Sequence, residues 1–207
     1  MSVSIRIADV VRWTGGSRVV GDAARVFRSV GIDSRRVAPD QLFVAIRGPR
    51  HDAHAFLSDA AAAGAAGLLV ESGAAIPDDA RARCAVVAVP DTTSALAALA
   101  AGHRDTWDGP IVAITGSNGK TTNKEMCAAI LSVRAPCLAT EGNLNNHYGL
   151  PLTLLRLEPA HRAAVVEIGM NHAGEIAPLA AIARPSVALL TNVGTAHIEN
   201  LGSQDAI

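Results

Sequence analysis

The feature that most constrains the fold of this chain is an apolar strand that runs directly into a glycine-rich loop and then into a helix. Residues 111–115 read Ile-Val-Ala-Ile-Thr, and residues 116–122 read Gly-Ser-Asn-Gly-Lys-Thr-Thr. Glycines let the backbone N–H groups of such a loop converge on one point, and the positive end of the following helix adds to their attraction for an anion. The pattern predicts a phosphate-binding loop in which Lys120 reaches the β and γ phosphates and Thr121 offers its hydroxyl to Mg²⁺.

The loop departs from the general P-loop pattern at one position. That pattern has a glycine where this chain has Ile114, so the loop is a variant with a G-x-x-G-K-T-T core. An ordinary glycine-rich turn is the alternative interpretation, but Lys120 and Thr121 fall in register at the helix start, which favours phosphate binding. Lys120 and Lys124 are the only lysines in a chain whose other basic residues are arginines, which hints that a compact ammonium group is needed here.

The sequence around this loop alternates between strand and helix patterns. Each apolar run is followed by a helical pattern, and the alternation predicts a parallel sheet with right-handed crossovers. The residues from Gly202 to Ile207 read as the N-cap and first turn of a further helix, so the domain is expected to be incomplete. The expected strands are 111–115, 137–140, 163–168 and 187–193, and the expected helices are 121–133, 150–157 and 174–183.

The first half of the chain predicts a separate, small α/β unit. An Ala/Leu-rich helix that begins near Thr92 ends this unit, and Asp108-Gly109-Pro110 then breaks the chain. The break predicts a boundary between domains at 1–108 and 109–207, and 207 residues give room for one complete core and part of a second. The other expected elements are helices at 4–13 and 55–63 and strands at 18–20, 42–46, 67–71 and 84–89.

Composition argues against nucleic-acid-binding and membrane-inserted classes. The charges are balanced, with 18 Lys+Arg against 19 Asp+Glu, and the few aromatic residues are scattered, so no nucleic-acid partner is expected. The chain has no run of about 18 apolar residues and no signal-peptide pattern. Three cysteines without CxxC spacing predict neither a disulfide framework nor a zinc site, and they favour a reducing, cytoplasmic location.

Two side chains at predicted strand ends are candidate metal ligands, because ligands of open parallel sheets bind beyond the carboxyl ends of the strands. Glu167 is a carboxylate in apolar surroundings, which needs a cation or hydrogen bonds, and Mg²⁺ shared with a nucleotide would supply the cation. His197 follows the last strand pattern, where a ligand role and a structural or solvent-facing role are both open. Four histidines without such a placement are expected at the surface: His51, His54, His103 and His161.

Several further motifs occur together in a set order. After the phosphate loop come Glu141-Gly-Asn-Leu-Asn-Asn146 with Gly149-Leu-Pro151, Glu167-Ile-Gly-Met-Asn171 and Thr191-Asn-Val-Gly-Thr-Ala-His197, and the first half contains Gly31-Ile-Asp-Ser-Arg35 and Leu42-Phe-Val-Ala45. This set resembles the Mur ligases of peptidoglycan synthesis, a family that serves cell-wall formation, cell shape and cell division. Within it, the chain is most similar to the members that join D-alanyl-D-alanine to UDP-N-acetylmuramoyl-tripeptide.

The resemblance implies a small N-terminal α/β domain that binds the uridine nucleotide, followed by an incomplete P-loop parallel-sheet domain. It also implies an ATP-dependent ligase in which ATP phosphorylates the terminal carboxylate of the UDP-linked peptide. The amine of D-alanyl-D-alanine would then attack the acyl phosphate. By position, the ATP-binding residues would be Gly116, Ser117, Asn118, Gly119, Lys120, Thr121 and Thr122; the Mg²⁺ ligands Thr121, Glu167 and His197; the catalytic residues Lys120, Glu167 and His197; and the substrate-binding residues Ser34, Arg35, Asn145 and Asn146.

The resemblance also implies parts that would lie beyond Ile207. These are a carbamylated lysine in the helix after His197 and a C-terminal domain, so this chain by itself is expected not to be a working ligase, and the full-length protein is expected to be a monomer. The unfinished sheet is expected to leave an edge and an apolar face uncovered. Asp40 and Ala53 stand where the family commonly has glycine, which bears on uridine binding.

Two other functions remain open. One is the tripeptide-forming relative within the same family, which shares the first-domain motifs; the Asn145-Asn146 loop and Thr195-Ala-His197 favour the dipeptide-adding member instead. The other is a stand-alone nucleotide-binding module without catalysis, which the length of the chain would suit.

Overall fold

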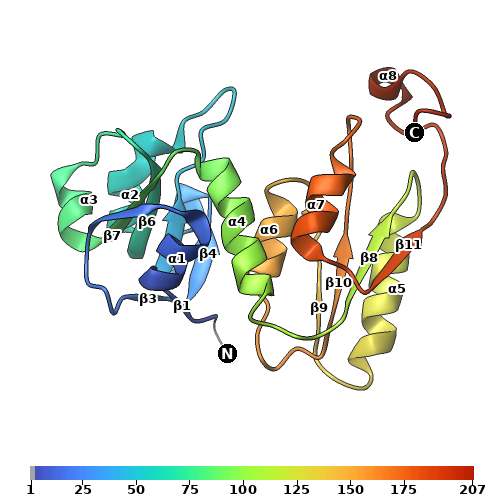
Figure 1. Cartoon of the computed structure of the whole chain (residues 1–207), viewed down its shortest axis with the longest axis horizontal. Helices are drawn as coiled ribbons and strands as arrows, with labels where there is room; N and C mark the ends of the chain where they lie inside the picture. The colour runs from blue at the N-terminus through green and yellow to red at the C-terminus, as the bar shows by residue number, and fades with distance from the viewer. Residues whose placement is uncertain (1–2) are drawn as a thin grey trace. The chain divides into compact units, whose positions relative to one another are not determined.

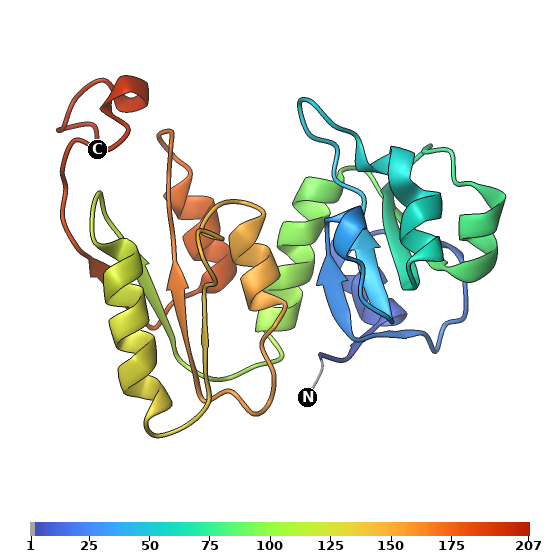
Figure 2. The same ribbon diagram turned by 180° about the vertical axis from the view of Figure 1, so that it is seen from behind.

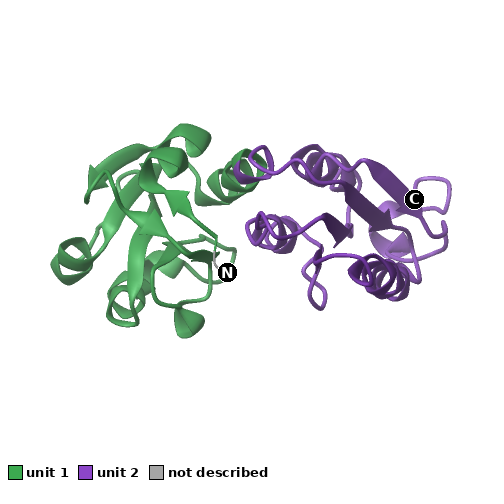
Figure 3. Ribbon diagram, turned by 90° about the horizontal axis from the view of Figure 1, so that it is seen from below, with its two compact units in different colours: residues 1–102 green, residues 103–207 purple. Residues whose placement is uncertain are grey.

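The computed structural model describes residues 3–207, which form two compact units that divide between Gly102 and His103 (Figure 3). The division falls inside α4 (Thr92–Arg104). The boundary predicted after Asp108 lies a few residues further along the chain. No helix within residues 3–207 combines the length and the apolar character that a membrane span requires.

The first unit is built on a five-stranded sheet in the order β2-β7-β6-β5-β4 (Figure 1). Only β2 runs antiparallel to its neighbour, and the other pairs are parallel. β6 lies in the middle and is buried along nearly its whole length, as expected for a strand covered on both faces. The strands are β2 (Ser17–Val20), β4 (Ser29–Gly31), β5 (Gln41–Val44), β6 (Ala65–Glu71) and β7 (Ala85–Val89).

The remaining elements of the first unit are short. β1 (Ile5–Arg6) pairs antiparallel with β3 (Val26–Phe27), and this pairing replaces the start of the helix that the sequence predicts from Ser4. The helix itself ends as expected at Gly15, which adopts a left-handed conformation with φ 65°. The helical segments are α1 (Ile7–Thr14), α2 (Leu57–Ala62), α3 (Asp78–Arg83) and 3-10 turns at Ser34–Arg36 and Ala53–Phe56.

The second unit has the predicted alternation of strands and helices. All four strands are parallel, in the order β11-β8-β10-β9. The chain runs from β8 to the edge strand β9, returns to β10 and then passes β8 to reach β11, so right-handed crossovers put α5 on one face and α6 and α7 on the other (Figures 1 and 2). The elements are β8 (Ile111–Thr115), α5 (Lys120–Ser132), β9 (Cys137–Ala139), α6 (Gly149–Leu154), β10 (Ala163–Glu167), α7 (Ile176–Ala183) and β11 (Val187–Leu190).

Apolar side chains of the second unit are buried on one side of β8 and exposed at the β11 edge. Ile114 and Val165 are fully buried against Ala128 of α5. Along β11, in contrast, Val187 and Leu190 are 56% and 58% exposed, as the expectation of an uncovered sheet edge requires. Three further apolar residues are exposed on α5 or directly after it: Met126, Ile130 and Val133.

The chain after β11 follows the expectation only in part. A short helix, α8 (Ile198–Leu201), ends at Gly202, whose φ is 86°. Ser203 Oγ then accepts the N–H of Ala206 at 3.2 Å and the Ser203 carbonyl accepts the N–H of Ile207 at 3.3 Å, so residues 203–207 form a capped turn rather than a helix.

The expectation that His54 and His103 lie at the surface is wrong, because His103 is buried and the His54 side chain is only 8% exposed. The Nε2 atom of His54 accepts the backbone N–H of Glu71 at 2.9 Å, and a ring nitrogen of His103 lies 2.9 Å from the carbonyl oxygen of Leu157. Neighbouring backbone groups thus satisfy both rings.

We predict that Gly67→Ala destabilises the first unit by about 1–3 kcal/mol. A Cβ at Gly67 would collide with the fully buried ring of Phe27 and crowd Leu42. The measurement is urea unfolding followed by Trp13 fluorescence in a Trp107→Phe background, so that only the first unit reports. Adding Phe27→Leu to Gly67→Ala should recover part of the lost stability. An unchanged urea midpoint for Gly67→Ala would contradict the close packing of Phe27 against Gly67.

Candidate active site

The phosphate loop has the geometry that its glycines predict. It joins the end of β8 at Thr115 to the start of α5 at Lys120. Gly116 has φ 131°, and a Cβ there would collide with Thr191 Oγ1, while Gly119 has φ 80° and occupies the N-cap of the helix. Both positions therefore favour glycine, as expected for a loop that turns its backbone N–H groups toward one point.

The segment after β11 braces this loop. Thr191 Oγ1 donates to the carbonyl oxygens of Asn118, at 2.6 Å, and of Thr115, at 3.2 Å. Asn192 accepts the N–H of Asn118 on its Oδ1 at 3.1 Å and the N–H of Ser117 on its carbonyl at 3.0 Å, and Ser117 Oγ accepts the N–H of Gly194 at 2.8 Å. The loop is thus fixed at several points because β11 lies beside β8.

Lys120 points its ammonium group back over the loop. Its Nζ donates to the carbonyl oxygens of Gly116, at 2.6 Å, and Ser117, at 3.2 Å. The positive charge therefore lies at the loop, where the helix N-terminus and the loop N–H groups also attract an anion. Thr122, the last residue of the predicted set, is exposed on the first turn of α5.

A buried carboxylate lies next to this loop. Glu167 ends β10 and is 2% exposed. Its Oε2 accepts a hydrogen bond from Thr121 Oγ1 at 2.9 Å, its Oε1 accepts one from Asn145 Nδ2 at 2.8 Å, and its backbone N–H donates to Thr140 Oγ1 at 3.0 Å. The structure therefore brings together Thr121, Glu167 and Asn145, all of which the sequence singled out.

The donor set around Glu167 suits Mg²⁺. Within residues 3–207 no lysine or arginine forms an ion pair with this carboxylate, so its charge is shared only with neutral donors. A carboxylate and a hydroxyl are hard oxygen ligands, and Mg²⁺ is usually held by one or two protein groups together with water and phosphate oxygens. Within the described residues there is no group of three or more His, Cys, Asp or Glu side chains that could hold a metal ion.

Two further predicted site residues belong to the second unit. Asn146 Oδ1 accepts the N–H groups of Tyr148, at 3.1 Å, and Gly149, at 2.9 Å, so this side chain caps the start of α6. His197 precedes α8 in a left-handed conformation with φ 60°.

Ser34 and Arg35 lie on the 3-10 turn of the first unit. Arg35 Nε lies 2.9 Å from Asp33 Oδ1 and its terminal nitrogen 2.9 Å from Asp33 Oδ2, while the Arg35 side chain is otherwise largely exposed and Ser34 is half-buried. These bonds from Arg35 lower the pKa of Asp33 to about 2. The guanidinium is therefore held in one orientation on the surface of this unit.

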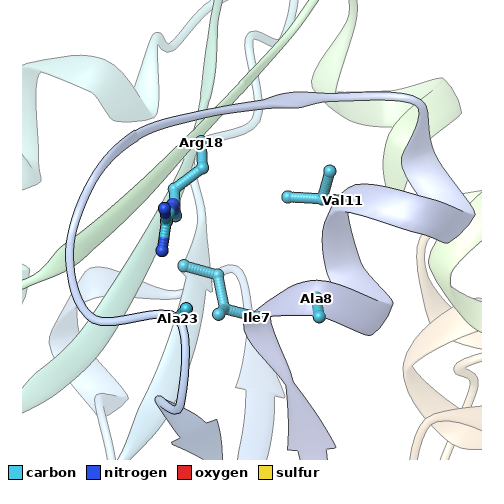
Figure 4. A pocket seen from close by; sticks show the side chains of 5 residues that line it. All are labelled: Ile7, Ala8, Val11, Arg18 and Ala23. Atoms are coloured by element: carbon cyan, nitrogen blue, oxygen red, sulfur yellow. The ribbon is translucent and has the colours of Figure 1, made fainter.

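A pocket of about 250 Å³ also occurs in the first unit, beside α1 (Figure 4). Its lining is apolar apart from one arginine and includes none of the predicted site residues. The lining residues are Ile7, Ala8, Val11, Arg18 and Ala23.

The second unit combines a parallel sheet, a braced glycine loop, a lysine at the start of the following helix and a buried carboxylate on the neighbouring strand. Together these features define an α/β domain of the P-loop type. Comparison with known families is more specific. Residues 26–104 match the catalytic domain of the Mur ligase family, and residues 114–207 match the Mur ligase middle domain. The chain belongs to the Mur ligase family.

The similar proteins are much longer than this chain. UDP-N-acetylmuramoyl-tripeptide–D-alanyl-D-alanine ligase of Escherichia coli (strain K12) is 46% identical over 175 residues, covering 84% of this chain and 37% of that protein. A crystal structure of MurF from Acinetobacter baumannii has a TM-score of 0.90 at 36% identity, covering 99% and 44% of the two chains. MurF ligase from Thermotoga maritima in complex with ADP has a TM-score of 0.75 at 35% identity, covering 86% and 40%. The chain thus spans roughly two fifths of their length.

The structure assigns functional contacts to residues that sequence reasoning left out of the site. Thr191 and Asn192 brace the loop, and Thr140 holds the backbone of Glu167. One signal was available for all three, since each is a polar residue in the last three positions of a predicted strand, near the edge of the sheet where ligands of parallel sheets bind.

We predict that Arg35→Ala raises the pKa of Asp33 from about 2 part of the way toward its ordinary value near 4, because the side-chain hydrogen bonds and charge of Arg35 are lost while the backbone N–H of residue 35 still donates to Asp33. In the native chain, the ionised Asp33 stabilises the folded state. This contribution is fully present above about pH 4, the ordinary pKa of the group, and is lost as the pH falls through about 2. Carboxyl carbon chemical shifts followed by NMR titration measure the pKa directly. Arg36→Ala is the comparison, because the charge of Arg36 is the weakest of the causes that lower this pKa and its loss should raise the pKa less than the loss of Arg35 does. An Asp33 pKa that stays near 2 in Arg35→Ala would contradict the role of Arg35.

Proposed function

We propose that this chain contains the UDP-substrate-binding and ATP-binding parts of a ligase that joins D-alanyl-D-alanine to UDP-N-acetylmuramoyl-tripeptide. The observation that carries the proposal is the contact of Thr121 with the buried Glu167 beside the phosphate loop. The names of the relatives at 35–46% identity supply the substrate class. The tripeptide-forming relative is the second candidate, and it rests on shared first-domain motifs.

ATP is the substrate that the loop is proposed to bind. The N–H groups of Ser117 and Asn118 already donate to Asn192, so the backbone N–H groups of Gly116, Gly119 and the start of α5 would receive the phosphates. Lys120 would exchange its bonds to loop carbonyls for bonds to phosphate oxygens. The ADP bound to the Thermotoga maritima relative supports this choice of nucleotide. The loop's N–H groups and the lysine both favour a polyanion over a neutral ligand.

Thr121 and Glu167 are the residues proposed to hold Mg²⁺ together with the nucleotide. When bound, the metal would neutralise the charge that develops on the phosphates during transfer. Asn145 orients the carboxylate through its hydrogen bond to Oε1. A second metal site at His197, uridine binding by Ser34 and Arg35, and a cleft role for Asn146 stay predictions, as does the cytoplasmic location.

The proposed reaction has two steps. A carboxylate oxygen of the UDP-linked peptide attacks the γ-phosphorus of ATP, and the bond to the β,γ-bridging oxygen breaks to release ADP. The amine nitrogen of D-alanyl-D-alanine then attacks the acyl carbon, loses a proton and displaces phosphate. The protein's contribution is to orient the groups and to stabilise charge on the transferring phosphoryl group, which is the task of Lys120 and the loop.

We predict that the 207-residue chain binds ATP and that Lys120→Met weakens this binding by about tenfold or more, since a charged hydrogen bond to phosphate is lost. Glu167→Gln should remove most of the tightening that Mg²⁺ gives, because the amide is a poorer metal ligand than the carboxylate. Isothermal titration with and without Mg²⁺ measures both effects. Arg134→Gln, which changes an exposed side chain just beyond the C-terminal end of α5, is the control. Equal affinities of all variants for ATP, with and without Mg²⁺, would contradict nucleotide binding at this loop.

We predict that a chain extended to the length of its relatives releases phosphate from ATP only when UDP-muramoyl-tripeptide and D-alanyl-D-alanine are both present. The 207-residue chain should show no release. If the extended chain instead turned over with the UDP-muramoyl-dipeptide and a single amino acid, the tripeptide-forming alternative would hold. Nucleotide binding without turnover in either chain would support the non-catalytic module.

A further inference from the structure

Lys124, the second lysine of the chain, is fully buried on α5. It lies one helical turn after Thr121 and therefore on the same helix face. Its Nζ donates to the carbonyl oxygen of Thr140 at 2.6 Å and to Glu125 Oε1 at 2.6 Å. Burying an ammonium group is costly unless it is paired and hydrogen-bonded, and Lys124 meets this condition through Glu125 and the Thr140 carbonyl. These two contacts therefore determine what Lys124 holds in place.

The contact with Lys124 coincides with a change in the hydrogen bonding of the sheet. Thr140 directly follows β9, and its N–H donates to the carbonyl of Val165, as in a regular parallel ladder. The next bond of such a ladder would join the N–H of Glu167 to the carbonyl of Thr140. Instead the Thr140 hydroxyl accepts that N–H at 3.0 Å, and the carbonyl bonds to Lys124.

Two routes lead from this contact to the Glu167 carboxylate. The first is direct, because the hydroxyl of the buried Thr140 holds the backbone of Glu167. The second follows the loop that leaves the sheet at Thr140 and returns over the end of β10. In that loop the side chain of Asn145 donates to Glu167 Oε1, and the backbone carbonyl of Asn145 accepts the N–H of Gly169 at 2.9 Å.

We propose that Lys124 is a positioning residue for the nucleotide's metal: by fixing the Thr140 carbonyl, it sets the Glu167 carboxylate and the Asn145 loop opposite the Thr121 hydroxyl. The inference rests on the proposed nucleotide function and extends it. Lys124 has no exposed surface, so it does not touch the nucleotide and is not a catalytic residue. α5 thus holds the ends of both β9 and β10 from one face, through Lys124 and Thr121.

The test compares ATP affinity in Mg²⁺ with ATP affinity in EDTA. The ratio reports the metal site, whereas affinity in EDTA reports the loop and Lys120. Lys124→Met removes the donors but keeps the length of the side chain, and Thr140→Val removes the hydroxyl while Thr140→Ser keeps it. Ala128→Gly, on the same helix but in its apolar contact with Ile114 and Val165, is the control for a general loss of stability.

We expect Lys124→Met and Thr140→Val to lower the ratio by about tenfold, the size typical of residues that orient a metal ligand. Their affinity in EDTA should stay within about twofold of the native chain. Thr140→Ser and Ala128→Gly should keep the native ratio. A native ratio in Lys124→Met, or equal losses in Mg²⁺ and EDTA, would overturn the proposal. If Lys124→Met does not fold, Lys124→Gln, which removes the charge and shortens the side chain, is measured in its place and decides by the same outcomes.

Amide hydrogen exchange separates this inference from the proposed function. Exchange at Glu167 and Gly169 should be faster in Lys124→Met than in the native chain and unchanged in Ala128→Gly, whether or not nucleotide binds. If the native chain bound no ATP, the proposed function would fail while the exchange result still tested the positioning role. Unchanged exchange in Lys124→Met would overturn that role.

Discussion

The hydrogen bond between Thr121 and the buried carboxylate of Glu167 is the interaction on which the rest of the second unit depends. It joins the first turn of α5 to the end of β10, so a helix start and a strand end are held at a fixed separation. A carboxylate that is 2% exposed is tolerated only with hydrogen bonds or a cation. Without a ligand, the hydrogen bonds from Thr121 and Asn145 hold the Glu167 carboxylate in place. These donors are neutral, so the negative charge of the carboxylate would still attract a metal ion.

The order of the strands explains why this contact forms. β8 and β10 are neighbours although β9 lies between them in sequence, because the chain goes to the edge of the sheet and returns. The carboxyl ends of β8 and β10 therefore meet beside the point where the strand order reverses, which is where ligands of open α/β sheets bind. β11 adds its following segment on the other side of β8, and that segment braces the loop.

Local patterns in the sequence were enough to predict the strand, loop and helix at 111–132 and the parallel alternation that follows. They were also enough to single out Thr121 and Glu167, whereas Asn145 was implied only by the resemblance to the Mur ligases. The pairing of β1 with β3 and the bracing by Asn192 could not be predicted in this way, because each depends on partners far along the chain. α3 was missed since only Ala80 is buried on it, which leaves little hydrophobic periodicity to detect.

The site is organised before any ligand arrives, and this has an energetic consequence. The loop is fixed by hydrogen bonds with Thr191, Asn192 and Gly194, and the Glu167 carboxylate accepts hydrogen bonds from Thr121 and Asn145. Ordering a flexible loop would cost conformational entropy on binding, and a loop that is already ordered avoids most of that cost. For the proposed nucleotide, the main rearrangement left would be that of Lys120, which would exchange its bonds to two loop carbonyls for bonds to phosphate. Because charge-assisted bonds to phosphate are stronger than bonds to neutral carbonyls, this exchange would favour the bound state.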